Sequence, residues 1–130
     1  MGGCDFWADH RGEEDASKAF HAAVEEAQYE YGHGGYTGTI AEMHEFVVVT
    51  PPANVDARLL AQFIHESDYK LISRKPEGLS ATEQVFYDSL PDGFKPKLRH
   101  LAEVHSDKWG PCLAIKIAPK WWAFFGWASS

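Results

Sequence analysis

Apolar residues recur at helical spacing after Asp15, and this pattern predicts the first helix of the chain. Asp15 suits the N-cap, and Gly32 suits a left-handed residue at the C-terminal end. Glutamates occupy the opposite side of the predicted helix. The residues on its apolar side are Ala16, Ala19, Phe20, Ala23, Val24, Ala27 and Tyr31.

Alternation of apolar residues at the end of the chain predicts a hairpin, with strands over 112–117 and 121–128. The second of these strands carries bulky rings on both faces, which is typical of a strand inside a sheet or of one covered by a helix. Residues 4–10 predict an earlier strand. Residues 39–42 and 46–50 predict a pair of strands, and the run Val47–Val49 favours a central position, covered on both faces.

Three further helices are predicted between these strands. Asn54 suits the N-cap of the first, Ser80 and Glu83 form a capping-box pattern that opens the second, and Pro96 suits the start of the third. The resulting order is β-α-β-β-α-(α-α)-β-β. We expect one α+β domain over 1–130, with a mainly antiparallel sheet of about five strands and helices mostly on one face. Residues 69–106 fit this pattern least well and are a candidate insertion.

Composition and charge narrow the classes of function. The chain of 130 residues is 45% hydrophobic and 14% aromatic, which favours a packed core over disorder. Its net charge of −7 disfavours direct binding to nucleic acid or to anionic membranes, and suits a basic protein partner. No apolar run is long enough to span a membrane. Two cysteines are no disulfide framework, so we expect a reducing, cytoplasmic setting.

A glycine-rich segment after the first helix is a candidate ligand-binding loop. Glycines let backbone N–H groups approach an anion closely, and hydroxyl groups add donors, so a nucleotide is conceivable. Phosphate loops, however, normally precede a helix, whereas this segment follows one. The alternative is a helix cap followed by a tight turn. Together with a second loop, the candidate ligand-binding residues are His33, Gly34, Gly35, Tyr36, Thr37, Thr39, Lys108 and Trp109.

Catalytic patterns are weak, and we expect no enzymatic activity. If the protein is an enzyme, His33 with Glu42 or Asp107 is the candidate acid–base set, because histidine titrates near neutral pH and a carboxylate can orient it. Seven histidines are present, but none has the spacing of a metal site, so we expect neither metal nor cofactor.

Acidic and aromatic residues are candidates for contacts with a partner protein. Carboxylates on the outer side of the first helix could meet a basic surface, and exposed rings commonly mark binding surfaces. The alternatives are a solvated helix face and core rings. Self-association is a further expectation. The candidate partner-binding residues are Glu25, Glu26, Glu30, Trp121 and Trp122.

Three stretches carry a resemblance to other proteins: AQYEYGHGGYTGTIAE over 27–42, DKWGP over 107–111 and FFGWAS over 124–129. They resemble a group of small uncharacterised proteins of tailed phages, prophages and related mobile elements. The resemblance implies a phage accessory protein in the host cytoplasm that binds and inhibits a host defence or regulatory protein. Such a partner could itself bind nucleic acid. Binding and sequestering a nucleotide or small signal molecule is the alternative.

Overall fold

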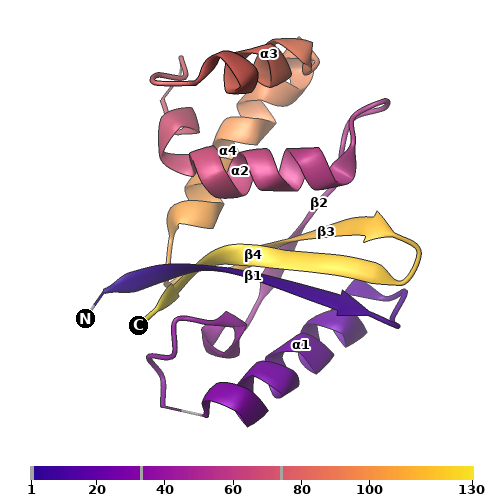
Figure 1. Ribbon diagram of the computed structural model, residues 1–130, viewed down its shortest axis with the longest axis vertical. Helices are drawn as coiled ribbons and strands as arrows, with labels where there is room; N and C mark the ends of the chain where they lie inside the picture. Colours follow the sequence, from indigo (N-terminus) through magenta and orange to yellow (C-terminus); the bar gives the residue numbers. More distant parts are fainter. Residues whose placement is uncertain (1, 33, 74) are drawn as a thin grey trace.

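The computed structural model describes residues 2–32, 34–73 and 75–130. One four-stranded sheet lies between two helical layers (Figure 1). The strand order is β1-β4-β3-β2. Helix α1 covers one face of the sheet, and α2 and α4 cover the other, with α3 packed beyond them. The α+β class predicted from the sequence is confirmed.

The C-terminal hairpin forms the centre of the sheet. Strands β3 (Cys112–Ala118) and β4 (Trp121–Ser129) pair antiparallel, as predicted. Strand β1 (Gly3–Arg11) adds antiparallel to β4 along its whole length, from Gly3 opposite Ser129 to Arg11 opposite Trp121. Strand β2 (Phe46–Val49) pairs with β3 in parallel. The sheet is therefore mixed, with two antiparallel pairs and one parallel pair.

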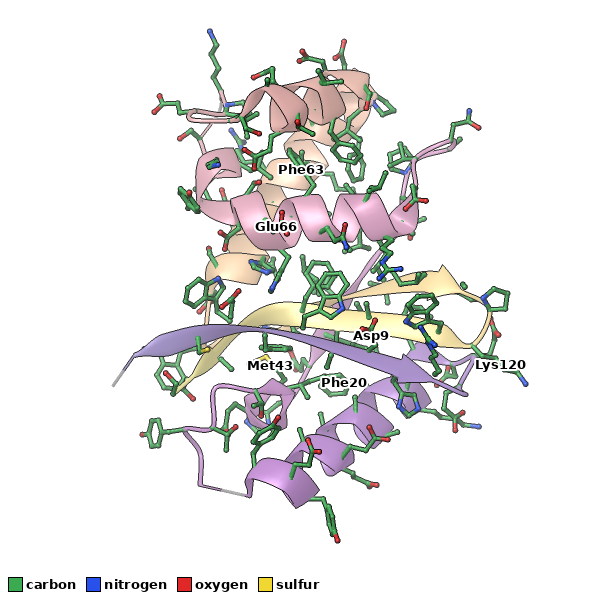
Figure 2. The ribbon with its side chains drawn as sticks, viewed as in Figure 1. Asp9, Phe20, Met43, Phe63, Glu66 and Lys120 are labelled. Atoms are coloured by element: carbon green, nitrogen blue, oxygen red, sulfur yellow. The ribbon has the colours of Figure 1, made fainter. Side chains whose placement is uncertain are left out.

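Helix α1 (Ala16–Tyr31) begins and ends at the predicted residues. The Asp15 carboxylate accepts a hydrogen bond from the backbone N–H of Lys18 at 3.0 Å. Gly32 ends the helix with a φ of 86°, which a side chain would disfavour. Ala19, Phe20, Ala23 and Ala27 are buried against the sheet. Figure 2 shows Phe20 of α1 and Met43 pointing into this interface.

The opposite layer contains three helices: α2 (Ala57–Leu71), α3 (Ala81–Ser89) and α4 (Lys95–Ser106). The apolar sides of α2 and α4 pack on the sheet through Leu60, Ile64, Leu98 and Leu101. Phe63 of α2 points away from the sheet toward α3 in Figure 2, where its ring lies 4.9 Å from that of Phe86. The helices thus lie on both faces of the sheet, with three of them on the same side.

Residues 69–106 contribute directly to this second core, because Leu71, Leu90, Phe94, Leu98 and Leu101 are buried in it. The segment is integrated with the fold rather than standing apart from it. The capping box predicted for α3 is present, with Ser80 and Glu83 bonding each other's backbone N–H groups.

Three local predictions are wrong. Residues 39–42 are not a strand: Ile40–Glu42 form a 3₁₀ helix, η1, because the Thr39 hydroxyl accepts from the N–H of Ala41 and caps the turn. Strand β2 is an edge strand, and only one of its faces is well covered: Val47 and Val49 pack in the core with α2 and α4, whereas Val48 is 45% exposed. The N-cap of α2 is Asp56, which accepts from Leu59, while Asn54 has a positive φ of 66°.

No helix in the described ranges has the length and apolarity needed to cross a membrane.

Candidate functional site

A hollow of about 520 Å³ lies where the glycine-rich segment meets the loop between α4 and β3. These loops are far apart in the sequence, and both were predicted to bind a ligand. The volume falls in the range of small-molecule sites. The hollow is lined by Gln28, Gly35, Ala41, Glu42, His44, Glu45, Lys108, Trp109, Gly110, Pro111 and Ser129.

The glycine-rich segment reaches the hollow because it is tied to the end of β4. The N–H of Gly38 donates to the Ser129 carbonyl at 2.7 Å, and the Ser129 hydroxyl donates to the Gly35 carbonyl at 2.9 Å. Gly38 has a φ of 71°, and a Cβ there would lie 3.2 Å from Cβ of both Cys4 and Ser130. Glycine is therefore required at this position by the backbone and by the close packing.

Two threonines hold the Glu42 carboxylate at the wall of the hollow. Glu42 Oε2 accepts from the Thr37 hydroxyl at 2.7 Å and from the Thr37 backbone N–H at 3.2 Å. The Thr37 and Thr39 hydroxyls lie 2.8 Å apart. These contacts fix the turn between α1 and η1. They also orient Glu42, so the segment serves as both a structural turn and a wall of the site.

The second loop is held by Asp107. Its carboxylate accepts from the N–H of Trp109 at 3.0 Å, and its carbonyl accepts from the N–H of Gly110 at 3.2 Å. This turn leaves the Trp109 indole 70% exposed at the rim of the hollow. Lys108 Nζ donates to the Gly2 carbonyl at 3.0 Å and lies 5.2 Å from the centroid of the Trp109 ring.

The charges around the hollow are mixed, with an acidic excess. Glu42 and Glu45 contribute two carboxylates, against one ammonium group from Lys108. His44 adds an exposed imidazole. A flat indole beside carboxylate acceptors suits a planar ring that carries N–H donors.

The structure brings some of the predicted ligand-binding residues together at this place. Gly35, Lys108 and Trp109 line the hollow, and Thr37 and Thr39 support Glu42. Gly34 and Tyr36 are exposed nearby in the chain but are not among the lining residues. His33 lies outside the described residues.

The candidate acid–base residues have local structural roles. Glu42 is bonded by Thr37, and Asp107 by Trp109. Their pairing with His33 stays a prediction, because His33 is outside the described residues. Cys112 is a poor nucleophile, since burial raises the pKa of its thiol to about 12.

The predicted partner-binding residues fall into two environments. Glu25, Glu26 and Glu30 are exposed on α1 and surround a broad, more open depression with Tyr29, which is 93% exposed. At the hairpin, the Trp121 indole donates to Asp9 at 3.0 Å and lies under the Arg11 guanidinium. Trp122 is only 7% exposed, and its indole donates to the Glu14 carbonyl, so it is a core residue.

Sequence reasoning missed a polar chain between the sheet and the second helical layer. It runs from Asp5 of β1 through His65 of α2 and His105 of α4 to Asp68 of α2. The available signal was His105, which shares its helical face with Leu98, Leu101 and Ala102 and therefore lies inside. Sequence reasoning also missed His44 and Glu45 of the hollow.

In the parts of the chain that the structure describes, no group of three or more His, Cys, Asp or Glu side chains has an arrangement that could hold a metal ion. The chain matches no protein-family model, no curated protein and no solved structure.

Proposed function

We propose that the protein binds a small ligand with a planar, nitrogen-containing ring, such as a nucleobase or nucleoside, without chemically changing it. The observation that carries this proposal is the exposed Trp109 indole at the rim of a hollow that both loops line. An indole left in solvent exposes a large apolar ring, and such rings are typical of binding surfaces.

The polar groups of the hollow favour one kind of ligand within this class. A base stacked on Trp109 could donate its exocyclic N–H groups to Glu42 or Glu45. Lys108 supplies one ammonium group to the hollow, which can balance only a small negative charge on the ligand. Nucleoside triphosphates carry several negative charges, which the two carboxylates and the net charge of −7 would repel. We therefore expect nucleosides and monophosphates to bind more tightly than triphosphates.

The test is calorimetric titration of the protein with nucleobases, nucleosides, monophosphates, triphosphates and cyclic dinucleotides. Trp109→Ala should weaken binding by about 5- to 150-fold, the equivalent of the roughly 1–3 kcal/mol that a stacked base contributes. Trp109→Phe should retain most of the affinity. Tyr69→Ala is the matched control, because Tyr69 is 69% exposed on α2 and does not line the hollow.

Two results of this titration would contradict the proposed function. Absence of heat with every compound in the panel would remove the ligand class. Equal weakening by Trp109→Ala and Tyr69→Ala would show that the hollow is not the site.

A second function, binding to a basic protein surface, is favoured by the exposed face of α1. Tyr29 stands almost fully in solvent among Glu25, Glu26 and Glu30. An aromatic anchor surrounded by carboxylates would suit a basic surface of a partner. In the phage setting that the sequence suggests, this partner would be a host defence or regulatory protein, including one that binds nucleic acid.

Tyr29→Ala separates the two functions, because it leaves the hollow intact. Co-elution of the protein with candidate host complexes should be lost in Tyr29→Ala if α1 is the interface. Unchanged co-elution of this variant would exclude α1 as the interface.

A further inference from the structure

Strand β1 forms one edge of the sheet, and its outer side pairs with no other strand of the described chain. Gly2 and Ser130, just beyond the paired strands, exchange two backbone hydrogen bonds. Because the pattern alternates along an antiparallel pair, the even-numbered residues of β1 turn their backbone groups toward β4. The N–H and C=O groups that face outward are those of Asp5, Trp7 and Asp9. Such a row of unpaired groups is a template for another strand.

A groove of about 390 Å³ lies between this edge and α1, which runs beneath β1 in Figure 1. Ala8 of β1 and Ala23 and Ala27 of α1 are among its lining residues, and their short side chains leave space beside the strand. Among the described residues, the groove and the hollow have no lining residue in common. The edge is therefore a surface distinct from the hollow.

The wall that α1 gives to this groove is acidic. Glu26 and Glu30 line it one helical turn apart, and both are exposed. Glu26 Oε1 lies 3.8 Å from His10 Nδ1, beyond hydrogen-bond distance, and the Glu26 side chain is 70% exposed. None of the described residues that line the groove is lysine or arginine. The groove thus offers two carboxylates to positively charged side chains.

The opposite face of the edge carries two aspartates, which disfavour pairing of β1 with a second copy of the chain. The Asp9 carboxylate accepts from the indoles of Trp7 and Trp121, at 3.1 and 3.0 Å. If two copies of β1 paired antiparallel along their whole length, Asp5 of each would lie opposite Asp9 of the other. Like charges in that position are destabilising, and each copy has a net charge of −7. A basic chain is the better occupant.

We propose that β1 binds an extended basic segment of a partner protein as a fifth strand of the sheet, with alternate lysine or arginine side chains directed at Glu26 and Glu30. Backbone hydrogen bonds with Asp5, Trp7 and Asp9 supply affinity, and the groove selects the charge. Residues four apart in a helix rise about 6 Å, and alternate residues of a strand are about 7 Å apart, so two basic side chains match the two glutamates. Their apolar stems suit the alanine-lined groove.

Hydrogen exchange of backbone amides, followed by NMR on the intact protein, tests the proposal. The probe is a synthetic peptide as long as β1 in which lysine alternates with valine. We expect exchange at Asp5, Trp7 and Asp9 to slow when the peptide binds, because their N–H groups become donors to it. Exchange at Phe6 and Ala8 should change much less, since their N–H groups already face β4.

A pair of double variants tests the charge selection. Glu26→Gln combined with Glu30→Gln should weaken peptide binding about 2- to 30-fold, because each exposed ion pair contributes about 1.4- to 5-fold. Glu25→Gln combined with Glu103→Gln removes the same charge at exposed positions outside the groove, and should have a smaller effect. A peptide of the same composition with its lysines grouped at one end should bind more weakly than the alternating peptide, because its lysines point to both faces.

Absence of binding would overturn the proposal, and so would binding that leaves exchange at Asp5, Trp7 and Asp9 unchanged. Equal weakening by the two double variants would overturn the role of the groove. Slow exchange at the same three amides without peptide, in a protein of dimeric mass by analytical ultracentrifugation, would show that the edge is occupied by a second copy instead. If a double variant fails to fold, as judged by circular dichroism, the exchange measurement on the wild type decides.

Discussion

Phe124 and Phe125 are neighbours in β4, yet each is the centre of a different core. Phe124 faces α1, and its ring lies 5.6 Å from that of Phe20 on α1 and 6.1 Å from that of Phe46 at the start of β2. Phe125 faces α2 and α4, and stacks on Trp7 at 5.1 Å. Both side chains are fully buried. A pair of adjacent residues therefore reports on the packing of each layer separately.

Substitution of either phenylalanine by alanine should destabilise the protein by about 3–5 kcal/mol, because each change removes a buried ring and leaves a cavity. Urea denaturation would measure the loss. Val85→Ala is the control, since Val85 is 71% exposed. A loss below about 1 kcal/mol at Phe124 would mean that the α1 layer is not packed as described, because truncating a buried ring normally costs several times more.

The two cysteines should also differ in reactivity. Cys112 is 1% exposed and burial raises the pKa of its thiol to about 12, whereas Cys4 is exposed on β1. A thiol reagent at neutral pH should label one cysteine in the native protein and both in denaturant. Cys4→Ser should abolish native labelling. Rapid native labelling of Cys112 would show that β3 opens easily.

At the scale of elements, α3 depends on polar contacts more than on burial, because none of its residues is fully buried. Glu83 closes its capping box and also reaches α2, where it accepts from Ser67 and from Lys70. These contacts meet α2 at a kink, where Ser67 departs from helical geometry. Glu83 therefore links α3 to α2 in addition to the contact of Phe86 with Phe63.

This link should make stability depend on pH in the acid range. Hydrogen bonds from Ser67, the Ser80 N–H and Lys70 lower the pKa of Glu83 from 4.5 to about 2. The unfolded chain therefore binds a proton more readily than the folded one. The stabilisation from Glu83 is fully present above pH 4.5 and is lost as pH falls toward 2.

Glu83→Gln should lower the free energy of unfolding at neutral pH and flatten its decline between pH 4.5 and 2. Urea denaturation across that range would measure both effects. Glu103→Gln, an exposed change on α4, should keep the wild-type slope. An equal slope for Glu83→Gln and the wild type would contradict the assignment.

The elements that sequence reasoning predicted well are those with local signals. Asp15 with Gly32, and Ser80 with Glu83, specify helix ends through groups only a few residues away. Residues 39–42 were misread because the bond from the Ala41 N–H to Thr39 and the bonds of Thr37 with Glu42 outweigh strand propensity. The edge position of β2 could not be predicted, since it depends on pairing with residues 112–115, far along the chain.

At the scale of the whole molecule, the contrast between local signals and contacts far apart in the sequence also applies to two polar regions. These are the hollow and the polar chain from Asp5 to Asp68. The loops of the hollow were predicted because glycines and an isolated tryptophan stand out in the sequence. That the two loops lie next to each other could not be predicted, because it depends on the hydrogen bond between Ser129, at the end of β4, and Gly35. The polar chain depends on the contact between His65 and His105, which are 40 residues apart in the sequence, so no local spacing predicts it.

Gly2 and Ser130, which lie just beyond the paired strands β1 and β4, hold residues from the two ends of the described chain side by side. Gly2 and Ser130 exchange backbone hydrogen bonds, each at 3.2 Å, and Lys108 at the rim of the hollow is bonded to Gly2. The path of the backbone is thus nearly a closed ring. We therefore expect the fold to tolerate chain ends placed at another exposed turn, provided that the residues of both cores are kept.

We expect a circular permutant to fold. In this variant a short flexible linker joins residue 130 to residue 2, and the chain starts at Gly78 in the exposed turn before α3. Its circular dichroism spectrum should match that of the native protein. Failure of this permutant to fold would show that β1 must be free at its start to pair with β4. Success would give a form in which a protein fused to the new ends is attached beside α3, away from the hollow that Trp109 lines.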